Sequence, residues 1–302
     1  MHVGVDLGGT KIEAAVLDAQ GNFRFRERLA TPQADYAATL QAIQTLMERA
    51  ESALNESCTA VGVGHPGSAN PIDGKIRNAN STCLNGQALH QDLETILQRP
   101  VRLSNDADCL ALSEATDGAA RGFKSVFAVI LGTGVGGGWF VHGQVLQGPN
   151  GLAGEWGHNP LPIAHNDEMP GPLCYCGKHG CIEAWLSGPA LIADYQQATG
   201  NTRPLDGRDL VAMTDAGDSA ANDALSRHTH RLARALGIII NVCDPEAIVL
   251  GGGVSQRPGL IDALTAALPA HVFLPTGTPL QTKLLLPAFG DSSGVRGAAR
   301  LF

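Results

Sequence analysis

The stretch that decides the fold is VGVDLGGTK at residues 3–11. Apolar residues lead into two glycines and a second apolar run follows at residues 12–17, which is typical of two strands joined by a tight glycine turn. The same pattern returns as FAVILGTG at residues 127–134, and it ends in WFV at residues 139–141. A chain that carries one strand–turn–strand unit twice is expected to consist of two similar halves.

A second pattern is repeated as well. AVGVGHPGS at residues 60–68 resembles AIVLGGGVS at residues 247–255, and each is typical of a buried strand that ends in a glycine turn. The order hairpin, helix, strand-plus-turn therefore occurs twice, which predicts two α/β domains around a cleft, with the domain change near residues 116–122. The expected helices cover residues 35–54 with Asp35 as N-cap, 106–115, and 219–242, where Asp244 and Pro245 follow.

The composition limits the class of protein. The 302 residues carry a net charge of −8, which argues against a surface for nucleic acid or anionic membranes. The sequence has no run of about 18 apolar residues to span a bilayer, and its start lacks the segments of a signal peptide. Seven cysteines, an odd number, fit a reducing compartment. The sequence therefore predicts a cytoplasmic protein that binds neither nucleic acid nor membrane.

Three glycine turns are candidates for nucleotide binding. Backbone N–H groups that converge without a Cβ in the way bind phosphate well, although the same glycines could simply make tight turns. Lys11 would lie near the phosphates or pair locally. The last turn could receive an adenine or ribose, or serve as a packing turn. The candidate residues are Gly8, Gly9, Thr10, Lys11, Gly132, Thr133, Gly134, Gly251, Gly252 and Gly253.

Residues 132–137 also match the dinucleotide pattern G-x-G-x-x-G. That fingerprint needs a helix after the glycines, whereas residues 138–141 are strand-like and run into a hairpin turn. A nicotinamide-dependent oxidoreductase is therefore not expected. Because the sequence also lacks a P-loop, ATP would bind to the pair of hairpins.

Two aspartates are candidates for the chemistry. Asp106 stands where a strand runs into a helix, the end at which α/β active sites form, and its carboxylate is suited to take a proton from an alcohol that attacks phosphorus. A helix N-cap is the alternative use of Asp106, and Asp108 could share that duty. Asp6, on the first strand, is suited to hold the hydration shell of Mg²⁺. The amide of Asn80, in a polar loop, suits either sugar hydroxyls or a surface turn.

The sequence CYCGKHGC at residues 174–181 holds three cysteines within eight residues. Three thiols and an imidazole make a Cys3His zinc set, with a disulfide as the rival explanation. Cys174 and Cys176 are too close for an easy disulfide, which a reducing compartment also disfavours. Four protein ligands leave no open position, so the zinc is predicted to be structural. The ligand set is His158, Cys174, Cys176 and Cys181, bracketed by Glu155 and Glu183.

These motifs, in their order and spacing, resemble those of the ROK family of sugar kinases, which have the duplicated actin-like ATPase (ribonuclease H-like) α/β fold. The resemblance runs from Val3 to Ala299. The motifs that carry it are Asp6-x-Gly8-Gly9-Thr10-Lys11, Asn105-Asp106-Ala107, Gly132-Thr133-Gly134-Val135-Gly136-Gly137-Gly138, Glu155-x-x-His158, Cys174-x-Cys176-Gly177-x-x-Gly180-Cys181-x-Glu183 and Gly251-Gly252-Gly253.

The resemblance implies roles for these residues. Asp106 would be the general base, the zinc-bound His158 would present its other imidazole nitrogen to the sugar, and the two hairpins would bind ATP with Mg²⁺. A smaller domain would comprise residues 1–117 with 291–302, and a larger domain with the zinc-binding insertion would comprise residues 118–290. Homodimers are common in the family. The residues expected to bind sugar hydroxyls are Asn80, Asn105, Glu155, His158 and Glu183.

Within the family, residues 78–81, 84–86, 156–161 and 290–297 look most like bacterial fructokinases of the manno(fructo)kinase type. The expected reaction is therefore the phosphorylation of the 6-hydroxyl of D-fructose by ATP. The alternatives are an N-acetylglucosamine kinase, a glucokinase or a mannokinase. A non-catalytic sugar-sensing regulator is less favoured, because the chain is acidic and little sequence precedes the first motif. Asp108 departs from the family pattern, which usually has Asn there, and adds a negative charge near the base.

Overall fold

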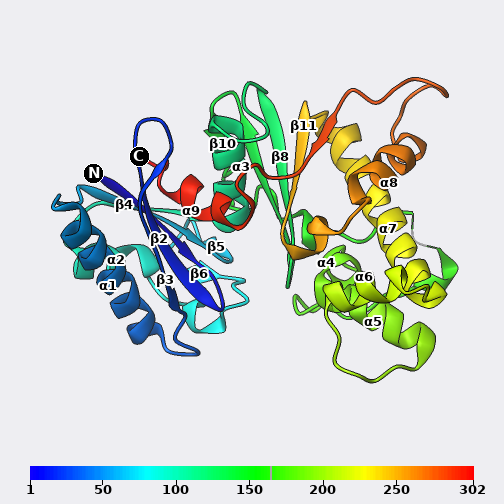
Figure 1. Cartoon of the computed structure of the whole chain (residues 1–302), viewed down its shortest axis with the longest axis horizontal. Helices are drawn as coiled ribbons and strands as arrows, with labels where there is room; N and C mark the ends of the chain where they lie inside the picture. Colours follow the sequence, from blue (N-terminus) through cyan, green and yellow to red (C-terminus); the bar gives the residue numbers. More distant parts are fainter. Residues whose placement is uncertain (164) are drawn as a thin grey trace. The chain divides into compact units, whose positions relative to one another are not determined.

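The computed structural model describes residues 1–163 and 165–302 (Figure 1). This part of the chain divides into two compact units. Unit 1 comprises Met1–Gly122, Gly138–Ala153 and Ala288–Phe302, and unit 2 comprises Phe123–Gly137 and Gly154–Pro287. The domain boundaries expected from the family resemblance stay a prediction.

Two five-stranded sheets have the same strand order, β3-β2-β1-β4-β7 in the first and β10-β9-β8-β11-β12 in the second. Strand β1 pairs antiparallel with β2 and parallel with β4, and β8 pairs parallel with β11. The repeated sequence patterns therefore mark a duplicated fold, and that prediction is confirmed. The strands are β1 (His2–Leu7), β2 (Lys11–Leu17), β3 (Phe23–Ala30), β4 (Ala60–His65), β7 (Val101–Asn105), β8 (Ser125–Leu131), β9 (Val135–Val141), β10 (Gln144–Val145), β11 (Ala247–Gly251) and β12 (Lys283–Leu285).

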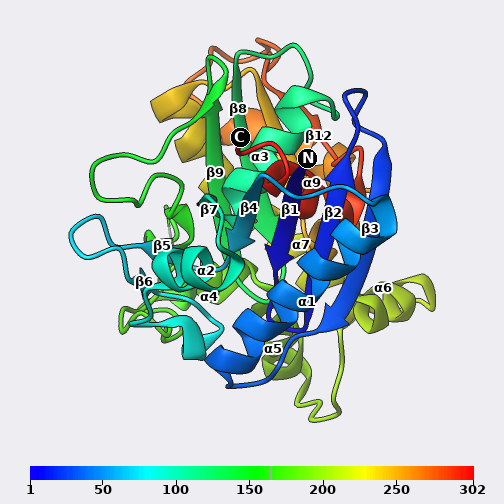
Figure 2. The same ribbon diagram turned by 90° about the vertical axis from the view of Figure 1, so that its left-hand side faces the viewer.

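Helices cover both faces of the first sheet, with α1 and α2 on one face and α3 and α9 on the other (Figure 2). Glycines in the strands let α9 approach the sheet backbone. A Cβ on Gly4 would lie 2.3 Å from the carbonyl oxygen of Val295, and one on Gly62 would lie 1.9 Å from that of Ala298. The helices are α1 (Tyr36–Leu54), α2 (Leu89–Leu97), α3 (Asp106–Thr116) and α9 (Ser293–Ala298).

The long helices begin and end close to where the sequence predicts. The side chain of Asp35 caps α1 by accepting from the backbone N–H of Ala38 at 2.9 Å. Helix α7 (Ser219–Cys243) is capped by Asp218, and it ends at Asp244, whose backbone is left-handed with φ 43°. Both helices use a carboxylate to satisfy N–H groups that lack a partner in the first turn. The predicted Asp35 cap and the predicted extent of the helix after residue 218 are confirmed, whereas the Asp218 cap was not predicted.

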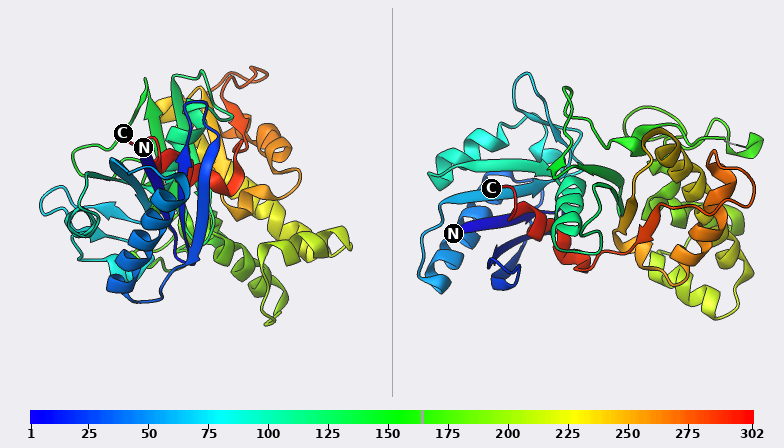
Figure 3. Two further views of the ribbon diagram at one scale, coloured as in Figure 1. Left: turned by 60° about the vertical axis from the view of Figure 1, so that its left-hand side comes forward. Right: turned by 90° about the horizontal axis from the view of Figure 1, so that it is seen from above.

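Helix α7 is the element around which unit 2 is packed, since α4, α5, α6 and α8 all contact it (Figures 1 and 3). Among the described residues, no helix combines the length and apolarity needed to cross a membrane. The other elements of the chain are α4 (Glu183–Leu186), α5 (Gly188–Thr199), α6 (Gly207–Asp215), α8 (Leu260–Ala267), β5 (Ser68–Ala69), β6 (Ile76–Arg77), η1 (Thr82–Leu84), η2 (Trp156–His158), η3 (Asn166–Glu168), η4 (Gly253–Gln256), η5 (Leu268–His271) and η6 (Gly290–Ser292).

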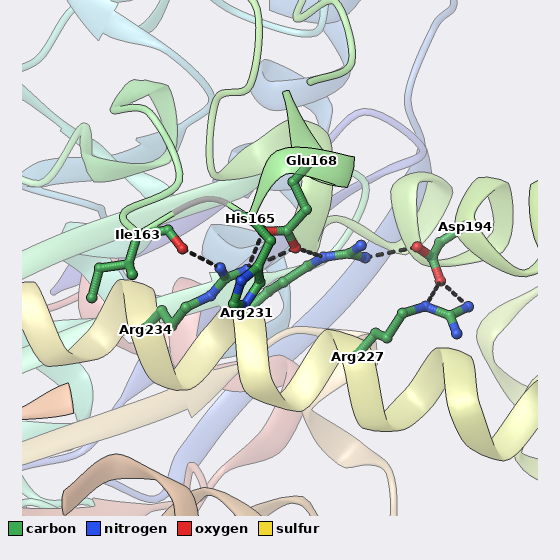
Figure 4. A network of polar contacts seen from close by, with 7 residues as sticks. All are labelled: Ile163, His165, Glu168, Asp194, Arg227, Arg231 and Arg234. Atoms are coloured by element: carbon green, nitrogen blue, oxygen red, sulfur yellow. Dashed lines mark hydrogen bonds and ion pairs between the residues drawn. The ribbon is translucent and has the colours of Figure 1, made fainter. Parts of the chain in front are cut away.

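A buried ion network fastens the segment before the cysteines to α7 (Figure 4). The carboxylate of Glu168 accepts from Arg231 at 2.8 Å and from Arg234 at 2.7 and 2.8 Å. Arg231 also donates to Asp194 of α5 at 2.7 Å, and Arg227 donates to the same carboxylate. Because each buried charge has a hydrogen-bonded partner of opposite sign, the network ties η3 and α5 to one side of α7.

Candidate functional site

The predicted base lies at the junction of β7 and α3, in unit 1. Asp106 is the first residue of α3, and its Oδ1 lies 2.8 Å from the backbone nitrogen of Ala107, which donates to it. The residue that caps the helix is Asn105, whose Oδ1 accepts from the same N–H at 2.8 Å. The amide nitrogen of Asn105 donates to the carbonyl of Gly67 at 2.9 Å. Asn105, predicted to bind sugar, thus also has a structural role.

Asp6, at the end of β1, lies close enough to Asp106 for their charges to interact. Burial raises the pKa of Asp6 to about 7, and the charges of Asp106 and Glu13 add to this effect against the opposing influence of Lys11. Its carboxylate also packs against α9, since a Cβ on Gly294 would lie 2.8 Å from Oδ2. Two carboxylates that repel each other form a site that a divalent cation would stabilise, and Mg²⁺ prefers such oxygen ligands.

The turn between β1 and β2 is fixed by its own backbone and by side chains of unit 1. The N–H of Gly8 donates to the carbonyl of Lys11 at 3.0 Å, and Thr31 donates to the carbonyl of Gly8 at 2.7 Å. The Nζ of Lys11 lies 3.0 Å from the carboxylate of Asp291, with which it forms an ion pair. Gly9 and Thr10, at the tip of the turn, are exposed.

Asn80 lies exposed on the polar loop that ends near η1. The side chain of Asn85 holds this loop, because its Oδ1 accepts from the N–H of Ala79 at 2.9 Å and its amide nitrogen donates to the carbonyl of Ala79 at 3.0 Å. The loop is therefore ordered by Asn85, and Asn80 is presented at its surface.

The matching turn of unit 2, between β8 and β9, is bonded directly to a predicted sugar-binding residue. Oε2 of Glu183 accepts from the N–H of Val135 at 2.9 Å. A Cβ on Gly134 would lie 2.6 Å from that oxygen, so a larger residue would force the carboxylate to shift from its position in this structure. The N–H of Gly188 donates to the carbonyl of Gly132 at 2.8 Å. Sequence reasoning placed Glu183 and this turn in separate roles and missed this direct contact between them.

Gly251 is the last residue of β11, and the two glycines that follow it have different environments. Gly252 has φ 85°, and a Cβ on it would lie 2.3 Å from the carbonyl oxygen of Leu131 in β8. A Cβ on Gly253 would meet nothing within 4 Å. The middle glycine is thus required for packing between strands, whereas Gly253 faces open space where a flat ring could approach.

The predicted zinc ligands come together in unit 2. One ligand atom from each of His158, Cys174, Cys176 and Cys181 lies within 4.8 Å of all the others. Sγ of Cys174 lies 3.6 Å from Nδ1 of His158, and the sulfurs of Cys176 and Cys181 are also 3.6 Å apart. Nδ1 is therefore the ring nitrogen that faces the thiols. The other ring nitrogen, Nε2, lies 3.1 Å from the hydroxyl of Tyr175.

A model of one protein family, described as the ROK family, matches residues 2–302. This chain belongs to the ROK family. An N-acetyl-D-glucosamine kinase of Yersinia pseudotuberculosis serotype O:1b (strain IP 31758) is 39% identical over 305 residues, covering 100% of this chain and 98% of that protein. An N-acetyl-D-glucosamine kinase of Shigella flexneri is 38% identical over 306 residues, covering 100% and 99%.

Solved structures of other ROK proteins agree with this fold. The ROK hexokinase from Thermus thermophilus is 34% identical, with a TM-score of 0.84 over 98% of this chain and 96% of that one. A ROK family glucokinase from Streptomyces griseus, solved with glucose and AMPPNP, is 28% identical, with a TM-score of 0.84 over 99% and 98% of the two chains. The actin-like ATPase fold expected from the sequence is therefore confirmed.

The structure distributes the predicted site residues of this ROK protein over both units. Their roles in catalysis and binding stay predictions, and so do the homodimer and the cytoplasmic location. Unit 1 carries Asp6, Gly8, Gly9, Thr10, Lys11, Asn80, Asn105 and Asp106. Unit 2 carries Gly132, Thr133, Gly134, Glu155, His158, Cys174, Cys176, Cys181, Glu183, Gly251, Gly252 and Gly253.

The Cys3His cluster of this ROK protein fits zinc by its donor chemistry and its spacing. Tetrahedral zinc holds sulfur and nitrogen ligands at about 2.0–2.3 Å, which sets ligand atoms about 3.4–3.8 Å apart. The two separations of 3.6 Å, Cys174 Sγ to His158 Nδ1 and Cys176 Sγ to Cys181 Sγ, agree with that geometry. Cys174 and Cys181 are buried, and Sγ of Cys174 lies 3.8 Å from Glu183. A metal here would fix the positions of both His158 and Glu183.

Proposed function

We propose that this chain, an ATP-dependent sugar kinase of the ROK family, phosphorylates the primary hydroxyl of a hexose and that N-acetyl-D-glucosamine is the acceptor to test first. The acetamido sugar is supported by relatives that carry this name and match the whole chain at 38–39% identity. The fructose acceptor predicted from the sequence has less support. It stays the second candidate because the motif at residues 156–161 resembles fructokinases.

The observation that carries the catalytic proposal is the position of Asp106 at the start of α3, close enough to Asp6 for the two charges to interact. As the sugar oxygen bonds to the γ-phosphorus, the bond to the bridging oxygen breaks, ADP leaves, and the hydroxyl proton passes to the carboxylate of Asp106. Asp6 would hold Mg²⁺ through its hydration shell, and the cation would supply charge stabilisation at the phosphates. The pKa of Asp6, raised to about 7, shows that its ionised form is unfavourable in the site by itself, and a bound cation would stabilise that form.

Unit 2 contributes the contacts that we assign to sugar and phosphate. Glu183 joins the two functions, because its Oε2 is bonded to the turn at Val135 while its Oε1 lies 3.8 Å from Sγ of Cys174. We assign the zinc a structural role that orients His158 and Glu183 toward the sugar. The glycine turn at residues 132–134 would receive the ATP phosphates through its N–H groups.

An ADP-release assay tests the proposal. The purified chain is assayed with ATP, Mg²⁺ and each of five sugars: N-acetylglucosamine, fructose, glucose, mannose and N-acetylmannosamine. We expect the highest kcat/KM for N-acetylglucosamine. A clear preference for fructose would reverse the order of the two acceptors, and absence of ADP release with every sugar would refute the kinase itself.

A further inference from the structure

Tyr175 stands between two of the predicted zinc ligands in sequence and contacts a third in space. Its hydroxyl oxygen lies 3.1 Å from Nε2 of His158. The two rings meet edge to face, with centroids 5.2 Å apart and an angle of 90° between their planes. The side chain is nevertheless 63% exposed, so little packing holds it in place. Tyr175 was part of the cysteine motif, but the reasoning from sequence gave it no role.

With Nδ1 of His158 facing the thiols, its other ring nitrogen, Nε2, can donate one hydrogen bond. Nδ1 faces the thiols, and with zinc bound there it would carry no proton, so the ring proton would sit on Nε2. A single N–H makes one good hydrogen bond at a time. The hydroxyl of Tyr175, 3.1 Å from Nε2, would accept that bond. In the proposed function Nε2 of His158 faces the sugar. The Tyr175 hydroxyl and a sugar hydroxyl cannot both accept its single hydrogen bond.

The surroundings of the Tyr175 hydroxyl are those of a sugar site. Glu183 lies beside the cluster, with its Oε1 3.8 Å from Sγ of Cys174, and Glu155 precedes His158 in the same short segment. A hydroxyl that accepts from an imidazole N–H close to two carboxylates has the same hydrogen-bonding character as a hydroxyl of a hexose. These two carboxylates are the other residues of unit 2 that we assign to the sugar.

We propose that the Tyr175 hydroxyl is a placeholder for a sugar hydroxyl on Nε2 of His158, and that sugar binding requires the Tyr175 side chain to turn away. This inference rests on the proposed function, because it takes His158 as a sugar ligand. Tyr175 is thus a positioning residue that competes with the substrate. Because it is largely exposed, its displacement gives up little apolar burial.

The variant Tyr175→Phe removes the hydroxyl and keeps the ring that packs on His158. Losing one hydrogen bond should weaken the hold of residue 175 on His158, and with it the competition against the sugar, by a factor of about 2–10. We therefore expect the sugar KM to fall by about that factor. The kcat and the KM for ATP should stay unchanged, and calorimetry should show the same gain in sugar affinity. Tyr195→Phe is the matched control, since it also loses a phenol hydroxyl of unit 2, the one bonded to Asp218 at 3.1 Å.

The outcomes separate this inference from the proposed function. A sugar KM that is unchanged or higher in Tyr175→Phe would overturn the placeholder, provided that the zinc content equals that of the wild type. Nuclear magnetic resonance of the His158 Nε2 proton without sugar gives a second readout. We expect its signal to shift in the variant, and an unshifted signal would also overturn the inference. A wild-type chain that phosphorylates no hexose would instead refute the proposed function.

Discussion

Replacing Glu168 by glutamine tests whether the ion network of Figure 4 stabilises unit 2. Glutamine keeps the size of the side chain, but it turns one acceptor oxygen into a donor that faces other donors. The Glu168 carboxylate accepts from both Arg231 and Arg234, and its Oε2 accepts from the N–H of His165 at 2.9 Å. Only 6% of Glu168 is exposed, so water cannot replace these bonds.

The pKa of Glu168 gives the size of the effect. Burial by itself would raise this pKa, but hydrogen bonds from Arg231, His165 and Arg234 outweigh it and hold the pKa at about 2. An unfolded chain has a value of about 4.3, and each pKa unit corresponds to about 1.4 kcal/mol, so ionised Glu168 contributes about 3 kcal/mol. Because the folded pKa is depressed, this contribution is complete above about pH 4.3 and is lost as the pH falls toward 2.

Urea and thermal unfolding, followed by circular dichroism, measure this loss. For a unit of this size, about 3 kcal/mol corresponds to a fall of about 6–12 °C in Tm at pH 7. The gap between wild type and Glu168→Gln should narrow below about pH 4. Asp167→Asn makes the same chemical change at the exposed neighbour and should alter Tm little. A loss below about 1 kcal/mol at pH 7, typical of a surface ion pair, would refute the reasoning, and so would a gap that stays constant in acid.

Three further predictions concern the site. Asp106→Asn should lower kcat by about 10²–10⁴-fold with unchanged sugar affinity by calorimetry, and near-normal turnover would contradict its role as base. Asp6→Asn should raise the free energy of unfolding at pH 8 without Mg²⁺ by about 2–4 kcal/mol, because a raised pKa means that folding opposes the ionised form. Wild type should lose stability as the pH rises from about 4 to about 7, the pKa of Asp6, and the variant should not show this loss. If urea unfolding gave the same pH dependence of stability for both proteins, the prediction would be wrong. Chelation should reduce sugar affinity before affinity for an ATP analogue, whereas equal loss of both would mean that the metal only holds the fold.

The sequence was a good guide wherever the deciding interactions are local. The two hairpins, the Asp35 cap and the long helix after Asp218 follow from neighbouring residues, and the structure confirms them. The cysteine set could be recognised because zinc ligands combine a narrow choice of residue types with short spacing. The acceptor sugar was not decided in this way. The motifs favoured fructose, whereas relatives over the whole chain favour an acetamido sugar.

What the sequence determined by itself is therefore the duplicated α/β fold, the membership that the ROK motifs indicate, and the identity of the candidate residues. The tertiary structure decided which of these residues are hydrogen-bonded to one another and to the backbone. It gave the α3 cap to Asn105, bonded Glu183 to the glycine turn, and set Tyr175 against His158. The physical reason is that these contacts are made where the chain returns to itself, at distances that depend on packing and on no local pattern in the sequence.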